Sequence, residues 1–267
     1  MATAPIQRPQ VRREPSAYEA LKSHFDQHPE QRLSHPHKWD VSRSDIYADN
    51  TWHPIFREMR EAGPLHYIPE SPFGPYWAVV GHKAIQHIEA LPETFSSSWE
   101  HGGITILNRL TEEELAEAGV DRRELPMFIA MDRPEHTGQR RTVAPKFTPS
   151  AMTAMESEIR QRTGEVLDRL PHGETFDWVD KVSIELTTGM LAILFGFPWE
   201  DRRLLTFWSD WSGDTELASV RELDKMRWEI LHEMGAYFQS LWAERMQDPE
   251  PGDDLISMMI HSEAMNQ

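Results

Sequence analysis

The sequence predicts a mainly α-helical protein with one small β-sheet. From about residue 130 onward, apolar residues recur at the spacing of amphipathic helices. The one strong strand signal is the pair PLHYIPE and PYWAVVG, which flank the turn ESPFG and form a candidate two-stranded hairpin. Hydrophobic residues make up 39% of the 267 residues and aromatic residues 10%, which is enough to build a core.

Charge and cysteine content exclude several classes of protein. The net charge of -17 argues against a partner such as nucleic acid or an anionic membrane surface, because both require basic patches. The absence of cysteine excludes a disulfide framework, a thiolate zinc site and a cysteine nucleophile within these residues. The polar start lacks the apolar stretch of a secretion signal, and the longest uncharged run, residues 187–199, is too short to span a membrane. We therefore expect a soluble, cytoplasmic protein with no membrane span.

The N-terminal part is predicted to contain short helices around the hairpin. Residues 1–15 are expected to form a flexible tail. The stretch SAYEALKSHFDQHPEQ is predicted as an amphipathic helix, and TWHPIFREMREAG as another that Gly63 and Pro64 bring to an end. After the hairpin, HKAIQHIEAL forms a helix that ends before Pro92.

A long connection precedes the most informative helix. Residues 92–130 lack sustained periodicity apart from a short capped helix, TEEELAEAG, and a connection of this length is usually a lid or a binding loop. Asp132 is predicted to cap the next helix, with Pro134 in the first turn and Glu135 at the third position. That helix is expected to end just before Pro145.

The rest of the chain is predicted to be almost entirely helical. Thr148 and Pro149 open a helix that extends to about residue 170. Residues 180–195 are apolar nearly all round, so we expect this helix to be deeply buried. Further helices are predicted from Pro198, over residues 221–246, and in DDLISMMIHSEAM.

His136 and Arg140 form a candidate anion-binding pair. They are four residues apart in FIAMDRPEHTGQRRTVAPKFTPS, so they lie on one face of the predicted helix. Both side chains can donate charge-assisted hydrogen bonds to carboxylates. The spacing alone is more typical of a solvated helix face.

The segment MDRPEHTGQRRTVAPKFTPSAM resembles the turn, C helix and start of the D helix of bacterial cytochrome P450 monooxygenases, whose usual form is M-D-P-P-x-H-x-x-x-R-R. Three other stretches are similar to the family in the same order: SPFGPYWAVVGHKAI, ELTTGMLAILFGFPWEDRRLLTFWSDW and GDDLISMMI. Arg133 departs from the pattern at the first proline of the pair. FGPYW, LPMFIAMD and FPWEDRRLLTFWSD resemble one branch in particular, the soluble bacterial alkane and fatty-acid terminal hydroxylases.

The resemblance implies the N-terminal portion of a single cytochrome P450 domain, with helices A to H and the first sheet hairpin over residues 16–267, truncated before the I helix. It implies heme b as cofactor and insertion of one oxygen atom into an unactivated C–H bond of a hydrophobic substrate. Alkane or fatty-acid terminal hydroxylation is the expected reaction, with a terpene or steroid as the alternative substrate. Electrons are expected from NAD(P)H through a reductase and a ferredoxin-type partner.

The resemblance also assigns roles to particular residues. His136 and Arg140 correspond to the residues that contact the heme propionates. Arg141 and Lys146 are expected on the face that meets the redox partner, where opposite charges speed the encounter, although ordinary solvated surface explains them equally well.

Four apolar residues are expected to line the substrate pocket, because the family builds its substrate roof from this loop. The alternative is that they anchor a long loop to the core. They are Ile104, Ile106, Met127 and Ile129.

The iron-ligating cysteine of the family is absent from these residues, and so are the acid-alcohol pair of the I helix and its structural Glu-x-x-Arg. Glu200 and Arg203 match the last pattern by chance, in the E–F connection. We therefore expect no catalytic residue and no activity in these 267 residues alone. We also expect aggregation, because the helix over residues 180–195 lacks its partner helix.

Two other classes of function stay open from sequence. One is a non-catalytic helical protein that binds a hydrophobic ligand. The other is a histidine-based metal hydrolase, for which His24 with His28, and His35 with His37, are candidate ligands. No third ligand stands at a recognisable spacing, so no metal site is expected there.

Overall fold

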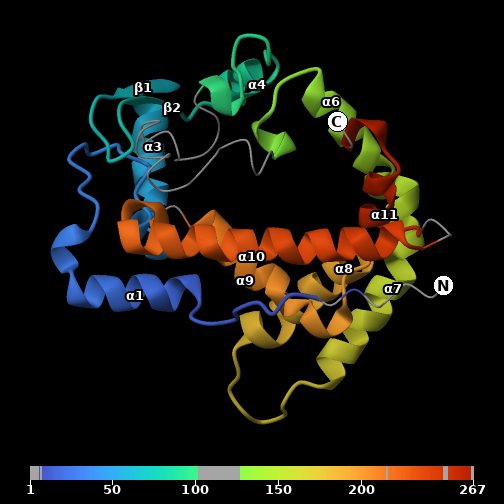
Figure 1. The fold of residues 1–267 in the computed structure, drawn as a ribbon. Coiled ribbons are helices and arrows are strands. Elements are labelled where there is room, and N and C mark those ends of the chain that lie inside the picture. The colour runs from blue at the N-terminus through green and yellow to red at the C-terminus, as the bar shows by residue number, and fades with distance from the viewer. Residues whose placement is uncertain (1–5, 7, 102–126, 215, 249–251, 266–267) are drawn as a thin grey trace. The chain divides into compact units, whose positions relative to one another are not determined.

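The computed structural model describes residues 6, 8–101, 127–214, 216–248 and 252–265 (Figure 1). The chain divides into two compact units. The first unit comprises Met1–Ala20, Pro134–Asp214 and Lys225–Gln267, and the second comprises Leu21–Arg133 and Thr215–Asp224. Helices predominate and the described strands form one two-stranded sheet, which confirms the predicted fold class.

The elements between residues 17 and 130 follow the predicted order. The helices are α1 (Ala17–Gln27), α2 (Asp45–Ala48), α3 (Trp52–Ala62) and α4 (His82–Glu89), the strands are β1 (Leu65–Ile68) and β2 (Tyr76–Val79), and single 3₁₀ turns lie at Pro29–Gln31, Trp99–His101 and Phe128–Ala130. The predicted helix TEEELAEAG lies outside the described residues.

The hairpin and α3 share one small core. β1 and β2 pair antiparallel, with Ile68 opposite Tyr76. Met59 of α3 and Ile68 of β1 are fully buried in a cluster with Ala78 and Val80. Two groups cap the C-terminal end of α3: the backbone N–H of Gly63 and the ring of His66 both hydrogen-bond to the Met59 carbonyl. These contacts confirm the predicted end of the helix and the predicted hairpin.

The elements after residue 134 also follow the predicted order. They are α6 (Glu135–Val143), a 3₁₀ turn (Ala144–Phe147), α7 (Pro149–Asp168), a π-helical segment (Val179–Ile184), α8 (Glu185–Phe195), a 3₁₀ turn (Trp199–Asp201), α9 (Arg203–Gly213), a 3₁₀ turn (Leu217–Ser219), α10 (Arg221–Met246), α11 (Leu255–Ile260) and a 3₁₀ turn (Glu263–Met265). α7 begins at Pro149 as predicted, and the Thr148 side chain caps it by accepting a hydrogen bond from the backbone N–H of Ala151.

The first unit is built on aromatic packing between α9 and α10. Trp208 is buried against Phe197, Tyr237 and Phe238, with ring centroids 5.4 to 6.2 Å from it. The Tyr237 hydroxyl donates to Asp201 at 2.7 Å, so the polar end of this buried ring is satisfied.

Two local predictions were wrong. Asp132 does not cap α6, which begins at Glu135 without a side-chain cap. Its carboxylate instead accepts hydrogen bonds from Ser96 and Ser97. The helix predicted over residues 180–195 begins as a π-helical segment, and most of its apolar side chains are half-buried rather than deeply buried.

The segment predicted as a flexible tail makes specific ion pairs within the first unit. Arg12 binds Glu233 of α10 through its backbone N–H at 2.9 Å and its Nε at 2.8 Å. Arg13 pairs with Asp201 at 2.5 Å, and the Trp211 indole N–H donates to the Pro15 carbonyl at 3.1 Å. These contacts fix where the segment lies, and its flexibility stays a prediction.

Among the helices that the structure describes, none is both long enough and apolar enough to cross a membrane.

Candidate functional site

The predicted anion-binding pair lies on α6. His136 is half-buried, whereas Arg140 is exposed one turn later on the same face. Glu135 stands in the first turn of the helix and Arg140 with Arg141 in the last, an arrangement that complements the helix dipole. In the described part of the chain, neither Arg140 nor Arg141 forms an ion pair, so their guanidinium groups can meet an external anion.

The C-terminal end of α6 is attached to the segment that follows α10. The hydroxyl groups of Thr142 and Ser262 lie 2.7 Å apart. Lys146, just beyond α6, pairs with Asp253 at 2.7 Å. The side chain of Lys146 is 20% exposed and that of Asp253 98%, so the ammonium group is largely buried and is paired with an exposed carboxylate. Of the two residues expected to face a redox partner, Arg141 therefore presents an unpaired charge and Lys146 does not.

The four candidate pocket residues are only partly described. Ile104 and Ile106 lie outside the described residues. Met127 and Ile129 are 49% and 59% exposed and flank a single 3₁₀ turn, in which Ala130 is buried. They belong to the second unit, whereas His136 belongs to the first.

Asp132 connects two segments of the second unit that are distant in sequence. Its Oδ2 accepts from the Ser96 hydroxyl at 2.5 Å and its Oδ1 from the Ser97 backbone N–H at 3.1 Å. The hydrogen bond from Ser96 is the main reason that the pKa of Asp132 lies below its usual range. The carboxylate therefore stays ionised and joins segments 35 or more residues apart in sequence.

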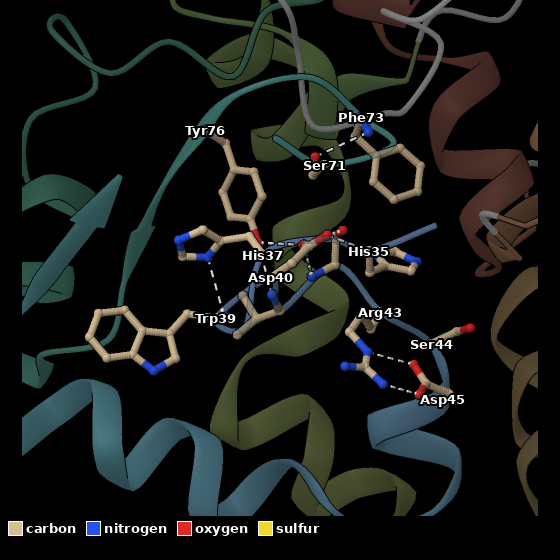
Figure 2. Close-up of polar contacts among 12 residues, drawn as sticks. His35, His37, Trp39, Asp40, Arg43, Ser44, Asp45, Ser71, Phe73 and Tyr76 are labelled. Carbon is tan, nitrogen blue, oxygen red and sulfur yellow. Dashed lines mark hydrogen bonds and ion pairs between the residues drawn. The ribbon is translucent and has the colours of Figure 1, made fainter. Parts of the chain in front are cut away.

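A buried polar cluster around Asp40 was missed by the sequence analysis (Figure 2). Asp40 is 1% exposed and accepts hydrogen bonds from the Ser42 hydroxyl, the Ser42 N–H, the His35 ring and the Tyr76 hydroxyl, at 2.6 to 3.0 Å. The Tyr76 hydroxyl also accepts from the Val41 N–H at 2.9 Å. Burial raises the pKa of Asp40, but the donors from Ser42 and His35 outweigh it, and the pKa lies below its usual range.

This cluster fastens residues 35–42 to β2. Two of the histidines noted for possible metal binding make other contacts. The His35 ring hydrogen-bonds to the Asp40 carboxylate, and the His37 ring accepts a hydrogen bond from the Trp39 N–H at 3.2 Å. A histidine five residues before an aspartate is too common a pattern to predict such a cluster. In the described residues no group of three or more histidines and carboxylates is arranged to hold a metal ion.

Comparison with known proteins assigns the fold. No family model matches the chain. A solved structure of cytochrome P450-153 from Novosphingobium aromaticivorans is 64% identical, with a TM-score of 0.75, and the match covers 86% of this chain and 55% of that one. The structure of CYP153D17 from Sphingomonas sp. PAMC 26605 is 53% identical, with a TM-score of 0.73 and coverage of 85% and 55%.

Curated relatives agree with the structures. Linalool 8-monooxygenase of Pseudomonas putida is 30% identical over 228 residues, which are 85% of this chain and 55% of that protein. Steroid C26-monooxygenase of Mycobacterium tuberculosis is 26% identical over 238 residues, 85% of this chain and 52% of that protein.

These matches define a partial cytochrome P450 fold, as the sequence predicted. By these similarities the chain is a partial cytochrome P450, and it spans about half the length of the curated relatives it matches. Two structures of the 153 group of that family share more than half of their aligned residues with it.

Proposed function

We propose that the protein to which this chain belongs is a heme-dependent monooxygenase, which inserts one oxygen atom of O2 into an unactivated C–H bond of a hydrophobic substrate. The observation that carries this proposal is the 64% identity to a solved cytochrome P450 over 86% of the chain. The names of the curated relatives, both monooxygenases, support the same reaction class.

The substrate we favour is an alkane or a fatty acid, hydroxylated at its terminal carbon. Support comes from the motifs FGPYW, LPMFIAMD and FPWEDRRLLTFWSD and from the similarity to structures of the 153 group. A terpene or a steroid is the second candidate, because the named curated relatives act on linalool and on steroids.

His136 and Arg140 are the residues that would hold the heme. Two cationic donors on one face of α6 suit its two carboxylate side chains, and each charge-assisted hydrogen bond contributes about 1.5–3 kcal/mol. Bound heme supplies the oxygen-activating chemistry. This part of the chain orients the cofactor and supplies no thiolate ligand, because the 267 residues contain no cysteine.

Electrons would reach the protein from NAD(P)H through a reductase and a ferredoxin-type partner in the cytoplasm. Arg141 offers an unpaired positive charge for an acidic partner, and Lys146 offers one only when Asp253 releases it. A helical protein that only binds a hydrophobic ligand, and a metal hydrolase, are the competing classes, and neither explains the similarity to one family along most of the chain.

The decisive experiment is to read the coding sequence beyond the codon for Gln267 and to express the whole protein. We expect a glycine-flanked cysteine, a thiolate-type Soret band in the reduced, carbon monoxide-treated protein, and 12-hydroxydodecanoic acid from dodecanoic acid. A stop codon directly after Gln267 would overturn the proposal, and a product from linalool but not from dodecanoic acid would favour the second substrate class.

A further inference from the structure

The second unit holds its Ser96–Ser98 segment and its 127–132 segment together through one carboxylate. We propose that Asp132 is a positioning residue, which fixes Met127 and Ile129 so that a long apolar substrate is held in one orientation. This inference rests on the proposed function, since it concerns the substrate contacts of that enzyme.

Both oxygen atoms of Asp132 are committed to the connection. Oδ2 accepts from the Ser96 hydroxyl at 2.5 Å and Oδ1 from the Ser97 backbone N–H at 3.1 Å. The Ser96 hydroxyl oxygen in turn accepts a hydrogen bond from the Ser98 N–H at 3.0 Å, so the Ser96–Ser98 segment is held in a tight turn. Hydrogen bonds to an ionised acceptor are about twice as strong as neutral ones, which strengthens this connection.

A helix-capping role does not explain Asp132. Its position before α6 predicts a cap, yet α6 begins at Glu135 with Pro134 before it and no side-chain cap. The carboxylate faces the other way, toward residues 96–97 of the same unit. The neighbouring pair of Arg133 with Glu93 is long, at 3.4 Å, and both side chains are at least 67% exposed, so it adds little.

The turn just before Asp132 carries the candidate substrate residues. Backbone hydrogen bonds close it, from Ala130 N–H to the Met127 carbonyl at 2.9 Å and from Met131 N–H to the Phe128 carbonyl at 3.2 Å. Ala130 is buried, whereas Met127 and Ile129 are exposed by half or more. The backbone hydrogen bonds fix the shape of the turn, and the Asp132 carboxylate attaches its C-terminal end to residues 96–97. We infer that this attachment sets the direction of the two exposed side chains.

The test uses the whole heme-loaded protein with dodecanoic acid as probe. Ser96→Ala removes the hydroxyl donor, whereas Ser97→Ala is a matched control, because Ser97 donates through its backbone. We expect Ser96→Ala, which loses one charge-assisted hydrogen bond, to raise KM about tenfold, and Asp132→Ala, which loses two, to raise it further. We also expect oxidation to spread from the terminal carbon to its neighbours, with heme content unchanged. Ser97→Ala should behave as the parent protein does.

Amide hydrogen exchange measures the connection itself. The Ser97 amide should exchange faster in Asp132→Ala and at the parent rate in Ser97→Ala. Faster exchange with an unchanged KM and product ratio would overturn the inference. If Asp132→Ala does not fold, Ser96→Ala and Asp132→Asn carry the same comparison. A parent protein without a thiolate-type Soret band overturns the proposed function, whereas a normal band with an unaltered product ratio in both variants overturns this inference alone.

Discussion

At the scale of single residues, the proposed heme contacts lie on α6. His136 and Arg140 stand on one face, and the neighbouring Arg141 points elsewhere because successive helical residues are turned by about 100°. Variants that remove the guanidinium group of Arg140 or of Arg141 can therefore be compared, to distinguish a specific anion contact from an effect of surface charge.

Arg140→Gln is expected to weaken heme retention in the whole protein about tenfold, because one charge-assisted hydrogen bond to a carboxylate is lost. Arg141→Gln makes the same change in net charge, but its side chain lies about 100° around the helix from that of Arg140. This variant should leave heme retention unchanged. The measurement is the rate of heme transfer to excess apomyoglobin. Equal rates in the two variants would contradict the assignment of Arg140.

Asp253→Asn is expected to strengthen binding of an acidic redox partner. Lys146 pairs with the Asp253 carboxylate at 2.7 Å, and the substitution removes this negative charge. Exposed pairs of this kind are worth at most about 1 kcal/mol, so the KM for a ferredoxin should fall by about fivefold or less at low salt. The double variant Asp253→Asn with Lys146→Gln should lose the gain, and a gain that persists would exclude Lys146 from the partner surface.

At the scale of elements, two junctions decide how the helices and the hairpin are held. One is the approach of α8 to Trp199, where a Cβ atom added to Gly189 would lie 3.0 Å from the indole ring. Trp199 is held from two sides, since the guanidinium groups of Arg162 and Arg202 lie 4.7 and 4.6 Å from its ring. The other junction is the Asp40 cluster, which fastens residues 35–42 to β2.

Gly189→Ala is expected to destabilise the first unit or to leave it unchanged, because the added methyl group must displace a ring that is held by two arginines. Gly164→Ala is the matched control on α7, where nothing lies within 4 Å of the added atom. There the loss of glycine entropy should stabilise the helix by about 0.5–1 kcal/mol. Urea unfolding followed by tryptophan fluorescence measures both, and an equal gain at Gly189 would contradict the close approach.

The Asp40 cluster makes stability depend on acid pH. The folded pKa of Asp40 lies below its unfolded value, so its contribution is fully present above the unfolded pKa of about 3.9 and is lost as the pH falls through the folded pKa. Asp40→Asn should lower stability at pH 7 and flatten this acid dependence. Asp26→Asn, at an exposed position, is the control for the change in charge. The same acid slope in the parent and in Asp40→Asn would refute the assignment.

At the scale of the whole molecule, the chain carries the two residues proposed to contact heme, but no cysteine that could bind its iron. The 267 residues contain no cysteine and span about half the length of the relatives they match. The expected heme site is therefore incomplete within these 267 residues, because they supply no thiolate ligand for the iron.

A sample of these 267 residues, mixed with heme, reduced and treated with carbon monoxide, should show no thiolate-type Soret band. The whole protein, measured under the same conditions, is the positive control. A thiolate-type band from the short chain would contradict the conclusion that it lacks the iron ligand, because only a cysteine thiolate gives that band.

The sequence by itself determined the family, the fold class and the order of the elements. Helix signals such as Thr148 before α7 and Gly63 after α3 act through local backbone geometry, so they can be recognised without tertiary contacts. The spacing of His136 and Arg140 likewise follows from the helix alone. Their role at the heme propionates stays a prediction.

Only the tertiary structure decided which partner each polar group takes. Asp132 carries a cap-like sequence signal, yet it binds Ser96 and Ser97 because these donors lie in space beside it. Asp40, Lys146 and Arg12 find their partners in the same way, through contacts between segments that are distant in sequence. Charge and hydrogen-bonding capacity are written in the sequence, whereas the pairing depends on distances that folding alone establishes.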